Sequence, residues 1–265
     1  MTRRPVSLAA GIMPEATPSQ LVEAAASAGF DFGGMWAERE SWTPQMTRAI
    51  RTQAREAGVQ LLDLEVAWIK PGEPDPWLCE LIDIAAELGA ANLLCVSSDP
   101  DPGATAAKLQ ELVDRAKGTG VRVNLEFGLF TEVKTIHDAL AILENVEGEA
   151  KALLVDTLHW SRSGGTSEEL AAIPHEWLSY CQPCDAPAEP PDFDDPDDVI
   201  DDAVNRRMPL GEGGLAVRAM LDALPDTLPC AVEQRSAALR KAFPDLDERA
   251  SEVLRTSRAF LDKAG

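Results

Sequence analysis

Four oxygen-bearing side chains stand at the ends of four apolar segments of the sequence. They are Glu126 in VRVNLE, Asp156 in ALLVD, Gln182 in LSYCQ and Glu233 in CAVE. A single strand-end acid often only pairs with an arginine, but several buried carboxylates raise one another's pKa and are costly to bury. A divalent cation removes that cost, and three carboxylates with an amide oxygen suit Mn²⁺ or Mg²⁺. Together the four residues predict one metal ion with positions open for substrate oxygens.

A repeated unit along the chain supplies elements that would bring these residues together. A Thr-Pro or Asp-Pro dipeptide at 17–18, 43–44 and 75–76 opens a helical pattern, a Gly ends it, and an apolar run follows. The Thr or Asp side chain caps free N–H groups, and Pro at the first helical position has no N–H to leave unpaired. The pattern indicates helices that alternate with strands.

Eight apolar runs are predicted to be strands. They cover 6–11, 30–36, 59–68, 92–97, 121–127, 152–156, 177–184 and 230–235, with further helices at 105–117, 135–145, 167–173, 215–224 and 247–263. Alternating strands and helices form a parallel sheet, and eight units in this length favour a closed barrel. No GxGxxG follows the first strand, which argues against a dinucleotide-binding fold. We predict an α/β fold in which residues 1–265 form a single (β/α)8 TIM barrel domain.

One segment departs from this rhythm after the seventh strand. Residues 185–205 hold nine acidic residues and four prolines. We predict a long acidic loop there. Such a loop on the C-terminal face of a barrel is either solvated surface or a lid over the site.

Composition narrows the classes of partner. The chain has 45 Asp and Glu against 24 Lys and Arg, a net charge of -21, so its field repels nucleic acid and anionic membranes. No apolar run approaches the roughly 18 residues that a membrane span needs. The five cysteines are an odd number and scattered, as expected for reduced thiols in a cytoplasmic protein. A small molecule is the partner class that remains, and a homo-oligomer is left open.

Several local motifs carry a family resemblance. They are NLEFG around Glu126, Asp-x-x-His over 156–159, Gln-x-x-Asp over 182–185, Arg-x-x-Pro over 206–209 and VEQRS around Glu233. In these motifs the chain resembles the sugar phosphate isomerase/epimerase family, the xylose isomerase-like barrels, over essentially its whole length. The resemblance implies that Glu126, Asp156, Gln182 and Glu233 are metal ligands.

The resemblance also implies which residues meet the substrate. His159 and Arg206 would contact it, and Glu65 in LDLEVAW would face it. Three tryptophans near strand ends could wall a carbohydrate-like ligand or simply pack, and they are Trp36, Trp68 and Trp160.

Two departures from the family pattern affect these expectations. Many relatives have His where this chain has Gln182, though some dehydratase-type members have an amide there. Preference for Zn²⁺ should therefore be weaker, with Mn²⁺ or Mg²⁺ expected and Co²⁺ or Zn²⁺ as alternatives. Leu210 interrupts the usual Pro-Gly, which leaves the loop geometry around Arg206 open.

The resemblance implies an isomerase or epimerase that works through a metal-stabilised enediolate. Glu126 and Glu233 are the candidate acid/base pair, and His159 is a further catalytic candidate. A dehydratase of the inosose or 3-dehydroshikimate type, or a catalytically silent ligand-binding barrel, remains an alternative. An endonuclease IV-type enzyme would need more zinc-binding histidines than the three present and a basic face.

Overall fold

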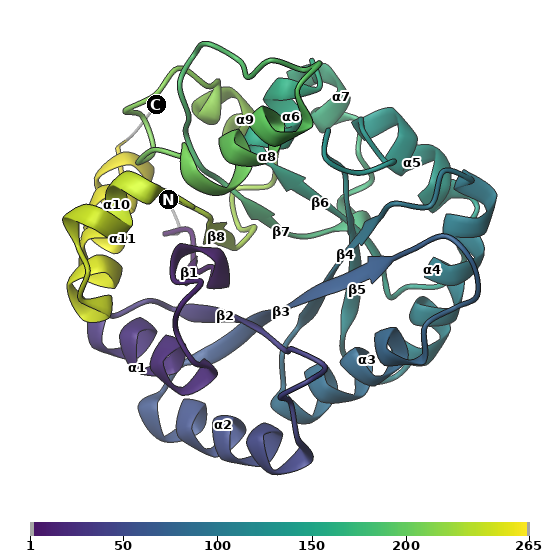
Figure 1. Cartoon of the computed structure of the whole chain (residues 1–265), viewed down its shortest axis with the longest axis horizontal. Helices are drawn as coiled ribbons and strands as arrows, with labels where there is room; N and C mark the ends of the chain where they lie inside the picture. Colours follow the sequence, from purple (N-terminus) through teal and green to yellow (C-terminus); the bar gives the residue numbers. More distant parts are fainter. Residues whose placement is uncertain (1–2, 264–265) are drawn as a thin grey trace.

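Eight parallel strands form a closed barrel in the computed structural model, which describes residues 3–263. Each strand pairs with the next along the chain, and the eighth closes on the first (Figure 1). The strands are β1 (Val6–Leu8), β2 (Phe32–Trp36), β3 (Gln60–Ile69), β4 (Asn92–Ser97), β5 (Arg122–Glu126), β6 (Lys151–Asp156), β7 (Leu178–Gln182) and β8 (Cys230–Val232). The predicted (β/α)8 barrel is confirmed.

A ring of helices surrounds the barrel (Figure 1). The helices are α1 (Pro18–Ala28), α2 (Pro44–Ala57), α3 (Pro76–Leu88), α4 (Pro102–Ala116), α5 (Ile136–Glu144), α6 (Thr157–Arg162), α7 (Ser167–Ala171), α8 (Pro196–Asn205), α9 (Val217–Ala223), α10 (Ala237–Ala242) and α11 (Leu246–Leu261), with 3-10 turns η1 (Ala10–Ile12) and η2 (His175–Trp177). Within residues 3–263 no helix has both the length and the apolar character needed to cross a membrane.

The first three helices begin and end as their sequence signals predict. Each starts at a Thr or Asp whose side chain accepts a backbone N–H, with Pro in the first turn. They end at Gly29, Gly58 and Gly89, where φ is 87°, 72° and 80°. Glycine adopts this left-handed conformation without a Cβ clash, so the chain can turn at once into the next strand.

Two hydrophobic clusters divide the strand side chains. The larger cluster packs the outward face of the barrel against the helices, and the smaller one fills the interior with residues such as Leu94, Leu154 and Tyr180. Alternation along each strand produces this division, since successive side chains point to opposite faces. The polar residues at the C-terminal strand ends therefore lie above a barrel interior that is filled with side chains.

The prediction of a continuous loop over 185–205 is wrong for its second half. Residues 196–205 form α8, because Asp195 caps the helix and Pro196 occupies its first turn. One of its acids is also not a solvated surface charge, since buried Asp202 accepts from Arg162 Nε at 2.8 Å. The same cap-and-proline signal that opens α1 to α3 is present here.

Candidate active site and metal centre

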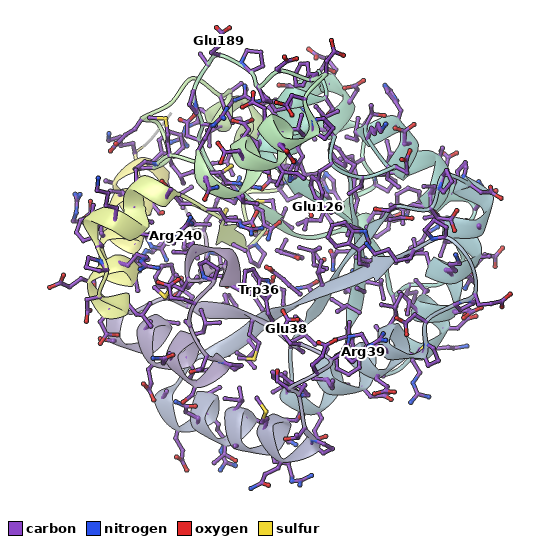
Figure 2. All side chains as sticks on the ribbon, viewed as in Figure 1. Trp36, Glu38, Arg39, Glu126, Glu189 and Arg240 are labelled. Carbon is purple, nitrogen blue, oxygen red and sulfur yellow. The ribbon has the colours of Figure 1, made fainter. Side chains whose placement is uncertain are left out.

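The four predicted ligands lie at the C-terminal ends of four neighbouring strands. Glu126, Asp156 and Gln182 are the last residues of β5, β6 and β7, and Glu233 directly follows β8. Their exposed fractions are 5%, 0%, 0% and 6%. Figure 2 shows Glu126 within the ring of helices, whereas Glu189 of the acidic segment lies at the outer edge. The fold thus gathers three carboxyl groups and one amide in a buried place.

A buried arginine that the sequence reading did not select lies among them. Arg207 Nη1 is 2.5 Å from Asp156 Oδ2 and 2.9 Å from Glu233 Oε2. Its Nη2 is 3.4 Å from His159 Nε2, and its Nε donates to the carbonyl oxygen of Ala203. The guanidinium supplies positive charge that partly offsets the cost of burying the two carboxylates.

Arg206, which the resemblance implied as a substrate contact, points elsewhere. Its Nε is 2.6 Å from Asp201 Oδ2, its Nη2 pairs with Asp198, and its side chain is 39% exposed. Arg206 is the C-cap residue of α8, with φ -106° and ψ 3°, and only one of the two arginines faces the centre. Arg207 is that residue. The sequence alone could not choose between the two, because the choice depends on the register of this segment against Asp185 and Ser236.

Asp156 has a structural task besides its place in the centre. Its Oδ1 accepts the backbone N–H groups of Leu158 and His159, which caps α6. Burial alone would raise its pKa, but the charge of Arg207 and the bonds to its oxygens lower the pKa below the usual value. Asp156 is therefore held as a carboxylate.

The donor set fits a divalent cation. Glu126, Asp156 and His159 offer ligand atoms within 4.8 Å of one another. Gln182 Oε1 is buried and has no hydrogen-bond partner among residues 3–263, an unsatisfied acceptor suited to a cation. His159 belongs to this group although the sequence reading gave it a catalytic role and not a ligand role. Glu233 is connected to this group of candidate ligands by its ion pair with Arg207.

The acidity of the centre reflects burial and mutual repulsion. Burial, followed by the charges of Glu233 and Asp156, raises the pKa of Glu126 well above its usual value. Burial also raises the pKa of Glu233 to about 7, with Arg207 opposing the shift. Burial lowers the pKa of His159 to about 4, so its ring is neutral at pH 7 and can accept a bond or ligate a metal.

A cavity of about 590 Å³ opens at this end of the barrel. Of the four predicted ligands, Glu126 and Glu233 line it, together with Glu65. Trp36 and Trp68 also line it, as expected for walls of a ligand pocket, and Figure 2 shows Trp36 near the centre of the molecule. Phe130 extends the wall, since its ring centroid lies 6.1 Å from Trp68 and 5.0 Å from His159.

Trp160 does not line this cavity. It is 3% exposed and belongs to the outer hydrophobic cluster. A Cβ at Gly165 would lie 2.2 Å from Trp160 Cδ1, so the indole packs directly on that glycine. The sequence left two roles open for Trp160, a wall of the ligand pocket or simple packing. In the structure Trp160 packs in the hydrophobic core.

Glu65 forms a pair with a second buried acid, Asp63, that the sequence reading missed. Glu65 Oε2 accepts from Trp36 Nε1 at 2.6 Å, and its carboxyl group hydrogen-bonds to Asp63. Apart from Glu65, no N–H or O–H donor of the described chain reaches either oxygen of Asp63. Two carboxyl groups can bond only if one holds a proton. Burial raises the pKa of Asp63 to about 7, although its hydrogen bond with Glu65 opposes this shift. Asp63 follows two leucines in LLDLE, where an acid within a buried strand was the available signal.

Fold and site together define a (β/α)8 barrel with an acidic, arginine-containing centre at its C-terminal mouth. A family model described as the xylose isomerase-like TIM barrel matches residues 22–263. The chain belongs to this family. A comparison with curated proteins found no match.

Solved structures share the fold at low sequence identity. An IolI protein with a bound zinc atom is 16% identical with a TM-score of 0.81, covering 97% of this chain and 98% of that one. A D-allulose 3-epimerase from Methylomonas sp., in complex with D-allulose, is 17% identical with a TM-score of 0.69 and 98% coverage of both chains. A xylose isomerase-like TIM barrel/4-hydroxyphenylpyruvate dioxygenase fusion protein is 19% identical with a TM-score of 0.79. This chain spans only 44% of that fusion, which in turn covers 98% of this chain.

Proposed function

We propose that this protein is a divalent-metal-dependent isomerase or epimerase of a sugar, ketose or polyol-like substrate. The observation that carries the proposal is the cavity at the C-terminal mouth, where Glu126 and Glu233 face the same space as Trp36 and Trp68. Two carboxyl groups suit the movement of a proton, and aromatic walls suit the faces of a carbohydrate. The family supports the same class, since its neighbours in structure include sugar epimerases.

The metal would be held by Glu126, Asp156, Gln182 and Glu233, with His159 as a further donor in the same group. When bound, such a cation polarises a carbonyl oxygen and its neighbouring hydroxyl, which makes the hydrogen between them more acidic. Mn²⁺ or Mg²⁺ suits the oxygen donors best. The zinc of the IolI structure keeps Zn²⁺ and Co²⁺ among the candidates.

The chain's own residues would position the substrate and move the proton. Glu126 or Glu233 takes the proton from the carbon between the two oxygens, and the other returns it, because both reach the cavity. Return to the opposite face gives epimerisation, and return to the neighbouring carbon gives isomerisation. Glu65 lines the same cavity, and because burial raises its pKa well above the usual value, it would donate a proton to a substrate oxygen. Arg207 keeps Asp156 ionised throughout.

Dehydration is the second candidate, and Gln182 is the observation that favours it. Its amide occupies the ligand position where many relatives have His, and the resemblance pointed to amides in dehydratase-type members. Loss of a β-hydroxyl needs an acid close to the leaving oxygen, and Glu65, whose pKa burial raises well above its usual value, would supply one at the wall of the cavity. Both outcomes begin with removal of the same proton.

Incubation in D₂O tests the proposal. The purified protein with Mn²⁺ or Mg²⁺ is mixed with a panel of ketoses, inososes and 3-dehydroshikimate, and carbon-bound deuterium is followed by NMR. Deuterium in an epimer or isomer supports the first candidate, and an unsaturated product supports the second. A panel that shows neither exchange nor product, with metal bound, would contradict both and leave a ligand-binding barrel.

A further inference from the structure

Two cations, Arg235 and Lys70, lie at the mouth of the cavity, where Glu65 and Glu233 are acids near Arg235. Arg235 lies over the ring of Trp36, 5.7 Å from its centroid, and Lys70 Nζ lies 3.8 Å from the centroid of the Trp68 ring. Both line the same cavity as Glu126. Among residues 3–263 neither forms an ion pair, although acids outnumber bases almost two to one in this chain. Positive charge that lacks a partner at the mouth is available to a ligand.

The position of Arg235 is built into the backbone around it. A Cβ at Gly11 would lie 2.7 Å from Arg235 Cδ and 2.9 Å from its Cγ, so only glycine lets the arginine stem lie against η1. The Arg235 N–H donates to the carbonyl oxygen of Glu233 at 2.9 Å, and its own carbonyl oxygen accepts from Arg207 N–H at 3.1 Å. The ring of Trp36 adds a cation–π contact to the guanidinium. A held arginine loses little conformational freedom when a ligand binds.

Carboxyl groups on the same cavity do not remove this positive charge. Asp75 is paired with Arg39, and Glu38 and Glu40 are exposed, where solvent and salt screen them. Glu65 and Glu233 lie near Arg235, but within the described chain neither forms an ion pair with it. Lys70 is exposed and Arg235 is partly exposed. The positive charge of Arg235 and Lys70 therefore stays accessible at the mouth.

We propose that the substrate carries an anionic group, a carboxylate or a phosphate, that Arg235 and Lys70 bind while its hydroxyl-bearing carbons reach Glu126 and Glu233. The proposal rests on the function proposed above and names its substrate class. A guanidinium donates two parallel bonds to a carboxylate or phosphate, and an ammonium adds a compact charge. A neutral sugar would form no ion pair with Arg235 or Lys70.

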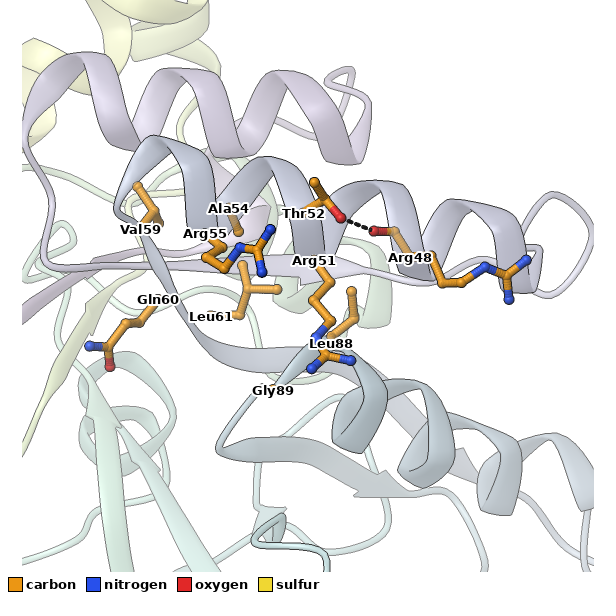
Figure 3. Close-up of a pocket in the computed structure, with 10 residues that line it drawn as sticks. All are labelled: Arg48, Arg51, Thr52, Ala54, Arg55, Val59, Gln60, Leu61, Leu88 and Gly89. Carbon is orange, nitrogen blue, oxygen red and sulfur yellow. Dashed lines mark hydrogen bonds between the residues drawn. The ribbon is translucent and has the colours of Figure 1, made fainter.

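A second basic cavity supplies the matched control. It measures about 570 Å³ and is lined by Arg48, Arg51 and Arg55 of α2, together with Leu88 and Gly89 (Figure 3). These arginines are exposed and form no ion pair within the described chain. Anions that follow charge alone would bind there as well.

Calorimetric titration of the Mn²⁺-loaded protein tests the proposal with matched probes. D-ribonate is compared with ribitol, and D-ribose 5-phosphate with D-ribose, so that the two pairs distinguish a carboxylate from a phosphate. We expect one anion to bind at least about tenfold more tightly than its neutral partner, as a charge-assisted bond allows. Arg235→Gln should abolish this preference, Lys70→Gln should reduce it, and Arg51→Gln should leave it unchanged.

The outcomes separate this proposal from the proposed function, because binding is measured without turnover. Equal affinities within both pairs, or a preference that survives Arg235→Gln, would overturn the anionic substrate class even if a neutral sugar is turned over. A preference lost in Arg51→Gln would assign the anion to α2 and overturn it too. A preference that depends on Arg235, found in a protein that catalyses no exchange, would support it while the proposed reaction fails.

Discussion

Two cavities of similar size, about 590 Å³ at the mouth and about 570 Å³ beside α2, differ in the chemistry of their walls. The mouth combines buried carboxyl groups, tryptophans and two cations held on aromatic rings. The α2 cavity has three exposed arginines and no carboxyl group or aromatic ring in its lining. Both cavities share their size and positive charge, so these two properties do not distinguish a functional site. The mouth differs from the α2 cavity because buried acidic and basic side chains converge there.

The barrel itself explains the difference. The mouth lies where strands end, and side chains from neighbouring strands converge there on one axis. The α2 cavity lies beside the start of β3, at Val59, Gln60 and Leu61, where the chain serves packing between α2 and α3. Substitutions in the two regions should therefore have effects of different kinds, and four experiments measure this.

The largest effect is expected for Glu126→Gln and Glu233→Gln. Each keeps an oxygen for the metal but loses the base, so kcat should fall by about 10²- to 10⁴-fold at saturating Mn²⁺. The measurement is turnover of the substrate identified by deuterium exchange. Glu56→Gln on α2 is the control and should retain full activity. Near-normal kcat in both mouth variants would show that His159 or Glu65 moves the proton.

Arg207→Met should have the second largest effect, which is a loss of unfolding free energy. Without the guanidinium, Asp156 and Glu233 are left as buried charges, and the metal-free protein should lose roughly 3–5 kcal/mol of unfolding free energy. Mn²⁺ should restore more stability to this variant than it adds to the natural protein, because Arg207 and the metal neutralise the same carboxylates. Urea unfolding with chelator or Mn²⁺ measures both. Arg206→Met, which removes an exposed pair, is the control, and an equal gain from Mn²⁺ in all three proteins would contradict the shared role.

Asp63→Asn should remove a pH dependence of stability. The pKa of Asp63 is about 7 in the fold against 3.8 as its ordinary value, so the native state binds the proton more tightly than the unfolded chain. Its contribution is complete below about pH 4 and is lost as pH rises through 7, at a cost of up to about 4 kcal/mol. Asn keeps an amide oxygen that accepts from Glu65, and it carries no charge. The variant's free energy of unfolding, measured with urea, should fall less between pH 5 and 8.5 than that of the natural protein. This pH range extends about one and a half units or more on each side of the Asp63 pKa of about 7. Parallel curves would contradict the shared proton.

Arg51→Gln on α2 should have the smallest effect. An exposed arginine without an ion pair contributes within about 0.5 kcal/mol to stability, and the residue lies beside no strand end that carries chemistry. Turnover and unfolding should match the natural protein. A large loss of activity would mean that the α2 cavity takes part in function and would remove the contrast between the two regions.

The sequence predicts those site residues whose position depends only on where a single strand ends. Glu126, Asp156 and Gln182 stand at strand ends because apolar alternation stops there, and β-strand order follows from the repeated unit. Helix starts at 17, 43 and 75 followed from local capping chemistry alone. Local rules suffice where the contact partners are close in the sequence.

Contacts between distant segments could not be predicted in the same way. Whether Arg206 or Arg207 enters the centre depends on how residue 206 meets Ser236 and how residue 208 meets Asp185. The contact of Asp63 with β2 depends on Gly34, where a Cβ would lie 2.8 Å from Asp63 Oδ1. Helix α8 is different, since its cap and proline were visible, and the high density of acids obscured them.

The capping of α6 by Asp156 ties the centre to the segment that borders the mouth. Helix α6 ends at Arg162, which holds Asp202 of α8 and donates to the carbonyl oxygens of Pro187 and Glu189. A replacement at Asp156 would therefore loosen the anchor of the acidic segment as well as the centre. Loss of activity in such a variant has two sources that one assay does not separate. The same hydrogen bonds limit which residue can replace Asp156, because a new side chain must cap α6 as well as serve the centre.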